Sequence, residues 1–238
     1  MPIASLKNVS KRFGETEVLK NISLEFEEGK FTCLLGASGS GKTTILRLLA
    51  GLEKPDAGEI YLHDNAVSKN GEIVVPASQR EIGFIFQDLA LWPHMTVYEN
   101  IAFGLKIKKM QNPEEKIEEL LDFFNLKGMG KRYPSQLSGG QQQLAAIARS
   151  LALNPKILLM DEPLASLDVK LKSKIRAEIK GLTDNFSVSV IYVTHDHHEA
   201  FRLADQIIVI NEGKIEAQGT PVEIKNSQNP FVKEFIEL

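Results

Sequence analysis

The sequence predicts an α/β fold with a mainly parallel sheet and an antiparallel β part near its N-terminus. Continuously apolar strand candidates alternate with helix-period segments along most of the chain, as is typical of parallel sheets covered on both faces. A glycine-rich loop separates one of these strands from the following helix. The 238 residues, of which 43% are hydrophobic, are enough for a sizeable core.

Three strands are expected before the glycine-rich loop, at Ala4–Val9, Val18–Phe26 and Phe31–Leu35. Each is rich in β-branched and other apolar residues, and Glu28-Gly29 supplies a turn signal before the last of them. We expect all three strands to belong to the N-terminal antiparallel part.

After the loop, the hydrophobic period predicts a helix from Lys42 to Ala50. The middle of the chain is also expected to be helical, and Asn112-Pro113 supplies a cap followed by proline at the first helical position. Four apolar residues share one face of that helix: Ile117, Leu120, Leu121 and Phe124. Another helix is expected to carry Leu171, Ile175, Ile179 and Leu182 on one face.

The remaining strands are expected at Glu59–Leu62, Ile82–Phe86, Ile157–Met160, Val188–Val193 and Gln206–Ile210. A helical block thus lies between two core strands. We expect one domain over residues 1–238, with a core made of 1–87 and 155–238 and a helical subdomain at 88–154.

Composition excludes several classes of protein. Lys and Arg number 28 against 31 Asp and Glu, so the net charge of −3 gives no global positive field for nucleic acid. The single cysteine, Cys33, cannot form an internal disulfide, and the N-terminus lacks the apolar segment of a signal peptide. No apolar run approaches the roughly 18 residues of a membrane-spanning helix. These features predict a cytoplasmic chain.

The glycine-rich loop matches the pattern G-x-x-x-x-G-K-[ST], in the strand-loop-helix context that this pattern requires. Gly39 and Gly41 allow backbone N–H groups to face phosphate oxygens, and the helix N-terminus favours negative charge. Lys42 is expected to reach the β- and γ-phosphates of ATP, and Thr43 to bind Mg²⁺. A glycine-rich turn with a solvated lysine is the alternative. The loop residues assigned to ATP are Gly36, Ala37, Ser38, Gly39, Ser40, Gly41, Lys42, Thr43 and Thr44.

Two adjacent carboxylates end the apolar strand near residue 160. Ligands in open α/β sheets bind at the carboxyl ends of the strands. Asp161 is expected to bind Mg²⁺ directly or through water, and Glu162 to act as general base towards the attacking water. A strand-ending turn without chemistry is the alternative for Asp-Glu-Pro.

A second helix N-terminus is suited to an anion. The segment Leu137-Ser138-Gly139-Gly140-Gln141 precedes a helix whose apolar face includes Leu144 and Leu151. Its hydroxyl, exposed N–H groups and helix dipole all favour a phosphate, although ATP already has its loop. A flexible glycine cap is the alternative.

Together, these three motifs resemble those of the ATP-binding cassette (ABC) ATPases, and the resemblance runs from Leu6 to about Phe235. It implies a phosphate-loop ATPase core and a head-to-tail dimer, formed with a second copy or a paralogous cassette. In such a dimer the signature residues Ser138, Gly139, Gly140 and Gln141 close over the ATP of the other subunit.

The resemblance also assigns individual residues. Phe13 matches the aromatic residue that stacks on adenine, and a buried core phenylalanine is the alternative. Gln87 matches the Q-loop glutamine, which senses Mg²⁺ and water, and an exposed loop amide is the alternative. Asp168 matches a residue at the dimer interface, and His195 matches the switch histidine that contacts the γ-phosphate. Glu162, His195, Gln87 and Lys42 are expected to contribute to catalysis.

The run His195-Asp196-His197-His198 also raises the possibility of a metal site. A strand-to-helix break is expected between the first and last histidines, and no cysteine or further histidine lies nearby. We therefore expect the two later histidines on a helix surface.

The segment Gln87–Ile101 resembles the Q-loop region of binding-protein-dependent importers of the sugar, polyamine, sulfate and ferric-iron group. In that group it contributes to the groove that receives a coupling helix of the membrane subunit. Trp92 is then a contact residue of the groove or simply packed in the helical subdomain. Many members continue as a regulatory β domain, and we expect this chain to lack one.

The resemblance therefore predicts an ATPase with ATP and Mg²⁺ as cofactors, working at the cytoplasmic face of the membrane. The expected partners are two permease subunits and an extracytoplasmic solute-binding protein, and no nucleic acid. The alternatives are the ATPase of an exporter, a soluble cassette acting on nucleic acid or ribosomes, and a cassette that binds ATP only to regulate.

Overall fold

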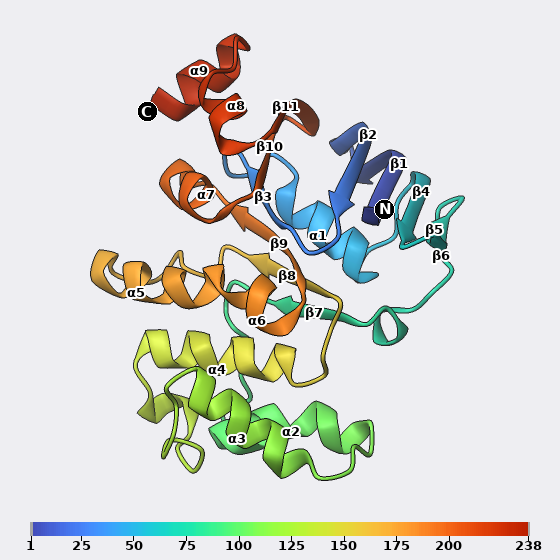
Figure 1. Ribbon diagram of the computed structural model, residues 1–238. Coiled ribbons are helices and arrows are strands. Elements are labelled where there is room, and N and C mark those ends of the chain that lie inside the picture. Colours follow the sequence, from blue (N-terminus) through green and yellow to red (C-terminus); the bar gives the residue numbers. More distant parts are fainter. Residues whose placement is uncertain (1, 238) are drawn as a thin grey trace.

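The computed structural model describes residues 2–237 and contains two sheets (Figure 1). The first sheet is antiparallel and has five strands in the order β2-β1-β4-β5-β6. Its strands are β1 (Pro2–Phe13), β2 (Thr16–Glu27), β4 (Ala57–Leu62), β5 (Asn65–Lys69) and β6 (Glu72–Ile73).

The second sheet has six strands in the order β11-β10-β3-β9-β8-β7, and only β11 runs antiparallel to its neighbour. Its strands are β3 (Phe31–Leu35), β7 (Ile82–Ile85), β8 (Ile157–Asp161), β9 (Ser189–Thr194), β10 (Gln206–Asn211) and β11 (Lys214–Gly219). The predicted fold class, with a mainly parallel sheet and an antiparallel N-terminal part, is confirmed.

Strand β3 corrects one expectation. Phe31–Leu35 was expected in the antiparallel part, but it pairs in parallel with β9 and β10 at the centre of the second sheet. The physical reason is its burial: all five residues are buried, whereas exposed and buried residues alternate along most of β2. A strand buried on both faces fits the middle of a covered sheet.

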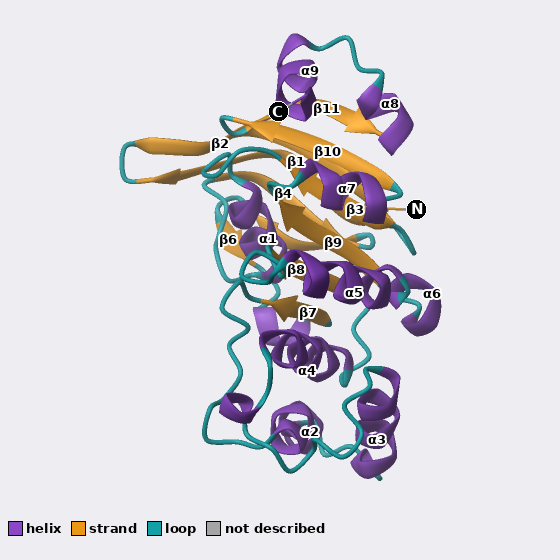
Figure 2. Cartoon of the chain, turned by 90° about the vertical axis from the view of Figure 1, so that its left-hand side faces the viewer, coloured by secondary structure: helices purple, strands orange, loops and turns teal. Residues whose placement is uncertain are grey.

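The helices lie on both faces of the six-stranded sheet (Figure 2). They are α1 (Lys42–Ala50), α2 (Val97–Ile107), α3 (Pro113–Phe123), α4 (Gly139–Leu151), α5 (Val169–Lys180), α6 (Leu182–Phe186), α7 (His197–Leu203), α8 (Pro221–Lys225) and α9 (Pro230–Glu237). Short 3-10 helices span Ala77–Gln79 and Pro134–Gln136. Helices α2 and α3 lie farthest from the sheets, beyond α4 (Figures 1 and 2).

Alternate residues of β3 face two separate cores. Leu34 belongs to a cluster that includes Ile45 of α1 and the antiparallel sheet, so α1 is packed between the two sheets. Phe31, Cys33 and Leu35 belong to the cluster on the opposite face, which contains residues of α2 to α5. Because successive strand residues point to opposite faces, one short strand joins both cores and fixes the loop that follows it.

Two helix predictions need correction. The helix expected to include Leu182 is divided at Gly181, where α5 ends and α6 begins, because glycine has a low helix propensity. Pro113 does begin α3, but the side chain of Asn112 makes no capping hydrogen bond; this residue has φ +50° instead.

Arg80 joins the antiparallel sheet to α1. Its buried guanidinium donates hydrogen bonds to the carbonyl oxygens of Leu48 and Leu49 at the end of α1, at 2.8 and 2.7 Å. It also donates to Val67 and Ser68 of β5, at 3.0 Å each. Burial lowers the pKa of Arg80 to about 10. The helix that follows the phosphate loop is therefore held at its far end.

Among residues 2–237, no helix combines the length and the apolar character needed to cross a bilayer.

Candidate functional site

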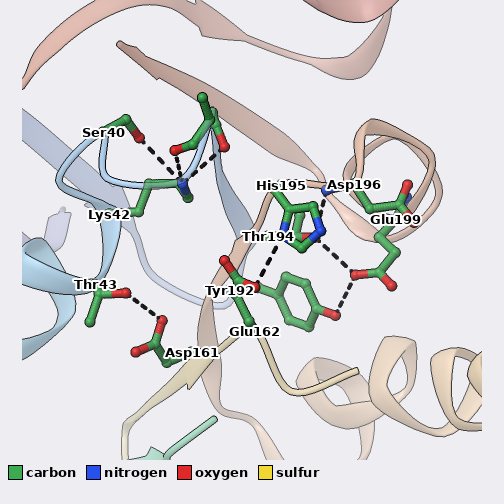
Figure 3. A network of polar contacts seen from close by, with 12 residues as sticks. Ser40, Lys42, Thr43, Asp161, Glu162, Tyr192, Thr194, His195, Asp196 and Glu199 are labelled. Atoms are coloured by element: carbon green, nitrogen blue, oxygen red, sulfur yellow. Dashed lines mark hydrogen bonds and ion pairs between the residues drawn. The ribbon is translucent and has the colours of Figure 1, made fainter. Parts of the chain in front are cut away.

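Three adjacent strands bring the glycine-rich loop, the Asp161-Glu162 pair and His195 to one edge of the parallel sheet. Strand β3 leads into the glycine-rich loop, β8 ends at Asp161, and β9 ends at Thr194 just before His195. Because β9 lies between β3 and β8, residues from three distant parts of the sequence meet at the carboxyl ends of the strands (Figure 3). This is the edge where open α/β sheets bind ligands.

The glycine-rich loop leaves the N-terminus of α1 without a side-chain cap. Gly41 is the N-cap residue, with φ +107°, and no side chain accepts a hydrogen bond there. A Cβ atom at Gly41 would lie 2.6 Å from Cδ2 of Leu19, so a larger residue does not fit. Ala37, Ser38 and Gly39 are exposed. The first N–H groups of the helix are thus available to an anion.

Lys42 lies inside the curve of the loop. Its ammonium donates to the carbonyl oxygens of Gly36 and Ala37 at 2.9 and 2.7 Å, and it lies 3.3 Å from Oγ of Ser40 (Figure 3). The residue is only 4% exposed, which excludes the alternative of a solvated lysine. Burial lowers the pKa of Lys42, and the charges of Glu162 and Asp161 partly oppose this shift.

Thr43 and Asp161 lie side by side at a cavity next to the glycine-rich loop. The Thr43 hydroxyl donates a 2.7 Å hydrogen bond to Oδ1 of Asp161. Burial raises the pKa of Asp161, the hydrogen bond from Thr43 lowers it, and the charge of Glu162 raises it further. Both side chains line a cavity of about 530 Å³ together with Gln87 and Arg47. Gln87 itself is exposed.

Glu162 and His195 face each other across the end of β9. His195 Nδ1 lies 3.0 Å from Oε2 of Glu162, and the imidazole is 56% exposed (Figure 3). Glu162 has φ +45°, and its N–H donates to the Val193 carbonyl at 3.1 Å. A left-handed backbone at a non-glycine residue costs about 1–3 kcal/mol and is concentrated at functional sites. Here it turns the chain out of β8 directly after Asp161.

The signature segment lies at the N-terminus of α4. The Ser138 hydroxyl accepts a hydrogen bond from the Gln141 N–H at 3.3 Å, and the Gln141 side chain accepts one from the Ser138 N–H at 3.0 Å. Ser138 and Gly139 are exposed, and Gly140 is buried beside Leu171. Within the described chain no hydrogen bond joins residues 138–141 to the glycine-rich loop.

Asp168 caps the N-terminus of α5. Its carboxylate accepts a hydrogen bond from the Leu171 N–H at 3.0 Å, and the residue is exposed. The preceding residues Ala165 and Ser166 line the same cavity as Thr43 and Asp161. Asp168 therefore lies at the start of a helix whose entry segment borders the site.

Phe13 is the last residue of β1 and is 45% exposed, which excludes the alternative of a core phenylalanine. The ammonium of Lys11 lies 4.9 Å from the centre of its ring. Lys11 is buried and bonded to the Lys54 carbonyl at 2.9 Å. One face of the ring therefore has a fixed cation beside it, which stabilises the ring orientation.

Sequence reasoning missed several residues that support the site. Lys11, Arg80 and Glu199 are buried charged residues, and a charge in the sequence pattern gives no sign that it will be buried. The histidine run forms no metal site: among residues 2–237, no group of three or more His, Cys, Asp or Glu side chains could hold a metal ion. His197 and His198 lie at the start of α7, and His198 is exposed.

The fold and the site define a phosphate-loop nucleotide-binding protein. A profile of the ABC transporter family matches residues 19–165. The chain belongs to this family, as an ATP-binding subunit and ATPase, and the predicted resemblance is confirmed.

Two curated relatives illustrate the similarity. The sulfate/thiosulfate import ATP-binding protein CysA of Thermosynechococcus vestitus is 47% identical over 235 residues, which is 98% of this chain and 68% of that protein. The spermidine/putrescine import ATP-binding protein PotA of Clostridium acetobutylicum is 45% identical over 237 residues, 98% of this chain and 66% of that protein. The chain thus spans about two thirds of the length of these relatives.

Solved cassettes share the fold. A nucleotide-free ATP-binding cassette from an ABC transporter has a TM-score of 0.84 and 30% identity, over 99% of both chains. The bacterial cassette MJ0796, solved as a dimer, has a TM-score of 0.80 and 37% identity, over 92% of this chain and 98% of that chain. MJ0796 is also known as a dimer in a post-hydrolysis state bound to ADP and Pi. Cassettes of this family therefore form dimers.

Proposed function

We propose that this chain dimerises head to tail and powers solute import through separate permease subunits in the membrane. The observation that carries the proposal is the position of the signature segment. Ser138 and Gly139 are exposed at the start of α4, and within residues 2–237 neither has a hydrogen bond to the chain's own phosphate loop. A second cassette, a copy or a paralogue, supplies the site that these residues would close.

Each composite site would hydrolyse ATP with groups from both chains. The loop N–H groups and Lys42 would hold the phosphates, which replace the loop carbonyls that Lys42 now contacts. Glu162 accepts a proton from the attacking water, the γ-phosphorus gains that water oxygen, and its bond to the bridging oxygen breaks to release ADP. Before this proton transfer His195 would leave Glu162, to which it is now bonded, and contact the γ-phosphate. Positioning and charge stabilisation supply most of the catalysis.

Mg²⁺ fits the oxygen donors that line the cavity at Thr43 and Asp161. Thr43, Asp161 and Gln87 offer hydroxyl, carboxylate and amide oxygens around one cavity, and oxygen ligands are those that Mg²⁺ prefers. The ion would neutralise phosphate charge there. Phe13 would stack on the adenine with the ring face that Lys11 does not occupy.

A groove beside α2 and α4 suits the permease. Trp92, Phe103, Ile107 and Leu153 line it, and Ile107 is 67% exposed. Arg149 of α4 donates to the Leu89 carbonyl at 2.8 Å and to that of Ala90, and its guanidinium lies 5.0 Å from the Trp92 ring centre. The helix that starts at the signature therefore ends at this groove, so it can transmit closure of the dimer to a helix docked there.

The chain would act at the cytoplasmic face of the membrane, attached through the permease, and an extracytoplasmic binding protein would deliver the solute. Residues 88–154 would form the helical subdomain that contacts the permease, and 1–87 with 155–238 the ATPase core. The candidate solutes are those of similar import ATP-binding proteins. They are sulfate or thiosulfate, the polyamines spermidine and putrescine, and Fe(3+) ions.

Co-expression with the membrane proteins encoded beside its gene tests the proposal. The complex should take up solute in proteoliposomes only with ATP. Ile107→Glu should prevent assembly and uptake while leaving basal ATP hydrolysis intact. The control Val222→Glu, at another exposed apolar residue, should leave assembly, uptake and hydrolysis unchanged. Docking can be followed by the fluorescence of Trp92, the only tryptophan. Efflux, or purification with ribosomes or nucleic acid in place of permeases, would contradict the import proposal.

A further inference from the structure

A buried carboxylate is hydrogen-bonded to the strand that leads into His195. Glu199, in the first turn of α7, is 3% exposed. Its Oε2 accepts hydrogen bonds from the hydroxyl of Tyr192 at 2.9 Å and from that of Thr194 at 3.0 Å (Figure 3). Both donors belong to the end of β9, so this one oxygen joins the helix to the strand that leads into His195.

The backbone on both sides of His195 is fixed by this network. Thr194 Oγ1 donates to Glu199 and also accepts a 3.0 Å hydrogen bond from the Asp196 N–H. Asp196 in turn caps α7 by accepting from the N–H groups of His198 and Glu199. The imidazole of His195 is by contrast 56% exposed and contacts only Glu162 among the described polar partners. The network therefore sets where the imidazole can reach.

The other oxygen of Glu199 has a different partner. Within residues 2–237, Oε1 is buried without a hydrogen bond, and the nearest cation is the Lys172 ammonium at 3.6 Å. A buried charge requires compensation, and Lys172 supplies it from α5. The Lys172 N–H donates to the Asp168 carbonyl at 2.8 Å. A series of contacts thus runs from Asp168 through Lys172 and Glu199 to Thr194, the residue directly before His195.

We propose that Glu199 is a positioning residue for His195, and that the Lys172–Glu199 pair couples the position of α5 to it. The inference rests on the proposed roles of His195 in hydrolysis and of Asp168 at the dimer interface. Because α5 begins at Asp168, a displacement of this residue on dimer closure changes the distance between Lys172 and the free oxygen of Glu199. Electrostatic interactions are strong at buried positions, so a small change there alters the hydrogen bonds that hold Thr194.

The coupling should affect hydrolysis and not nucleotide binding, because neither Lys172 nor Glu199 lines the cavity at Thr43 and Asp161. Lys172→Met should lower kcat for ATP by about 2- to 160-fold, the range that coupling energies between contacting residues span, and leave the Kd for ATP unchanged. Lys174→Met is the matched control: this lysine is exposed on the same helix. It should keep the wild-type kcat.

Glu199→Gln separates the ion pair from the hydrogen bonds, because the amide oxygen can still accept from Tyr192 and Thr194. It should reproduce the effect of Lys172→Met, and the double variant should be no slower than the slower single variant. The imidazole NMR signals of His195 should shift in both single variants and not in Lys174→Met. A purely structural ion pair would lower the melting temperature and leave kcat per folded protein and the His195 signals unchanged.

The inference is overturned if Lys172→Met and Glu199→Gln keep the wild-type kcat, or if their effects add independently. His195→Ala distinguishes a failure of the coupling from a failure of the proposed function. If His195→Ala hydrolyses ATP normally, the proposed role of His195 itself fails. If His195→Ala is inactive while the Lys172 and Glu199 variants are unaffected, only the coupling fails.

Discussion

The hydroxyl of Thr43 donates a 2.7 Å hydrogen bond to the carboxylate of Asp161, which lies 118 positions later in the chain. This contact joins the first turn of α1 to the end of β8. It holds two oxygen donors side by side at the cavity that Gln87 also lines. In the free protein the contact satisfies a buried carboxylate, and in the nucleotide-bound protein both oxygens would face one cation.

Asp161→Asn should therefore stabilise the free protein while abolishing hydrolysis. Burial raises the pKa of Asp161, so the folded chain disfavours its charged form. The free energy of unfolding therefore falls as pH rises from the pKa of Asp161 in the unfolded chain to its higher pKa in the folded chain. The asparagine variant should melt higher at pH 7.5, by about 2–4 °C for each 1 kcal/mol gained, and the difference should shrink at pH 4. Differential scanning calorimetry measures this.

The exposed Asp184→Asn serves as control for that experiment and should show no such pH-dependent gain. A melting temperature for Asp161→Asn below that of the wild type at pH 7.5 would show that the charge is net favourable in the folded chain.

Glu162→Gln should bind ATP but hydrolyse it about 10²- to 10⁴-fold more slowly, because the amide cannot accept a proton from water. The variant should accumulate with ATP as a closed dimer. Phosphate release gives the rate, and size-exclusion chromatography with ATP gives the oligomeric state. Near-normal turnover would refute the assignment of Glu162 as the base.

Ser138→Arg should abolish hydrolysis and leave ATP binding to the single chain unchanged, because the exposed serine is expected to contact the ATP of the other subunit. Ser135→Arg, at an exposed serine in the preceding segment, is the control for charge and size. Ser138 also caps α4, and loss of a cap costs about 1 kcal/mol, so the melting temperature should be recorded alongside. Unaffected turnover would count against a composite site.

Phe13→Ala should weaken ATP binding about 5- to 150-fold, which corresponds to the 1–3 kcal/mol that stacking contributes per base. Binding of inorganic tripolyphosphate should not change, because this ligand has no base. Phe13→Tyr keeps the ring and should bind both ligands as the wild type does. Isothermal titration with the two ligands makes the comparison, and an equal loss for both would exclude a stacking role.

The class of protein could be predicted from the amino-acid sequence alone. The phosphate loop, the Asp-Glu pair and the signature are local patterns, because backbone N–H groups, a helix N-terminus and a strand end need only neighbouring residues to form them. The periodicity of apolar residues also predicted the strands and helices. It did not predict that Gly181 divides one helix into α5 and α6, because a single glycine does not interrupt the apolar pattern.

The sheet that β3 joins could not be predicted, because a short apolar strand can pair in either sheet. Burial on both faces places β3 between β9 and β10. The same holds for the buried charges. Glu199 and Arg80 resemble ordinary surface residues in the sequence. The Lys172 side chain that pairs with Glu199 lies 27 positions away, and the Leu48 carbonyl that accepts from Arg80 lies 32 positions away. Such contacts depend on how the elements pack, and packing is a property of the whole chain.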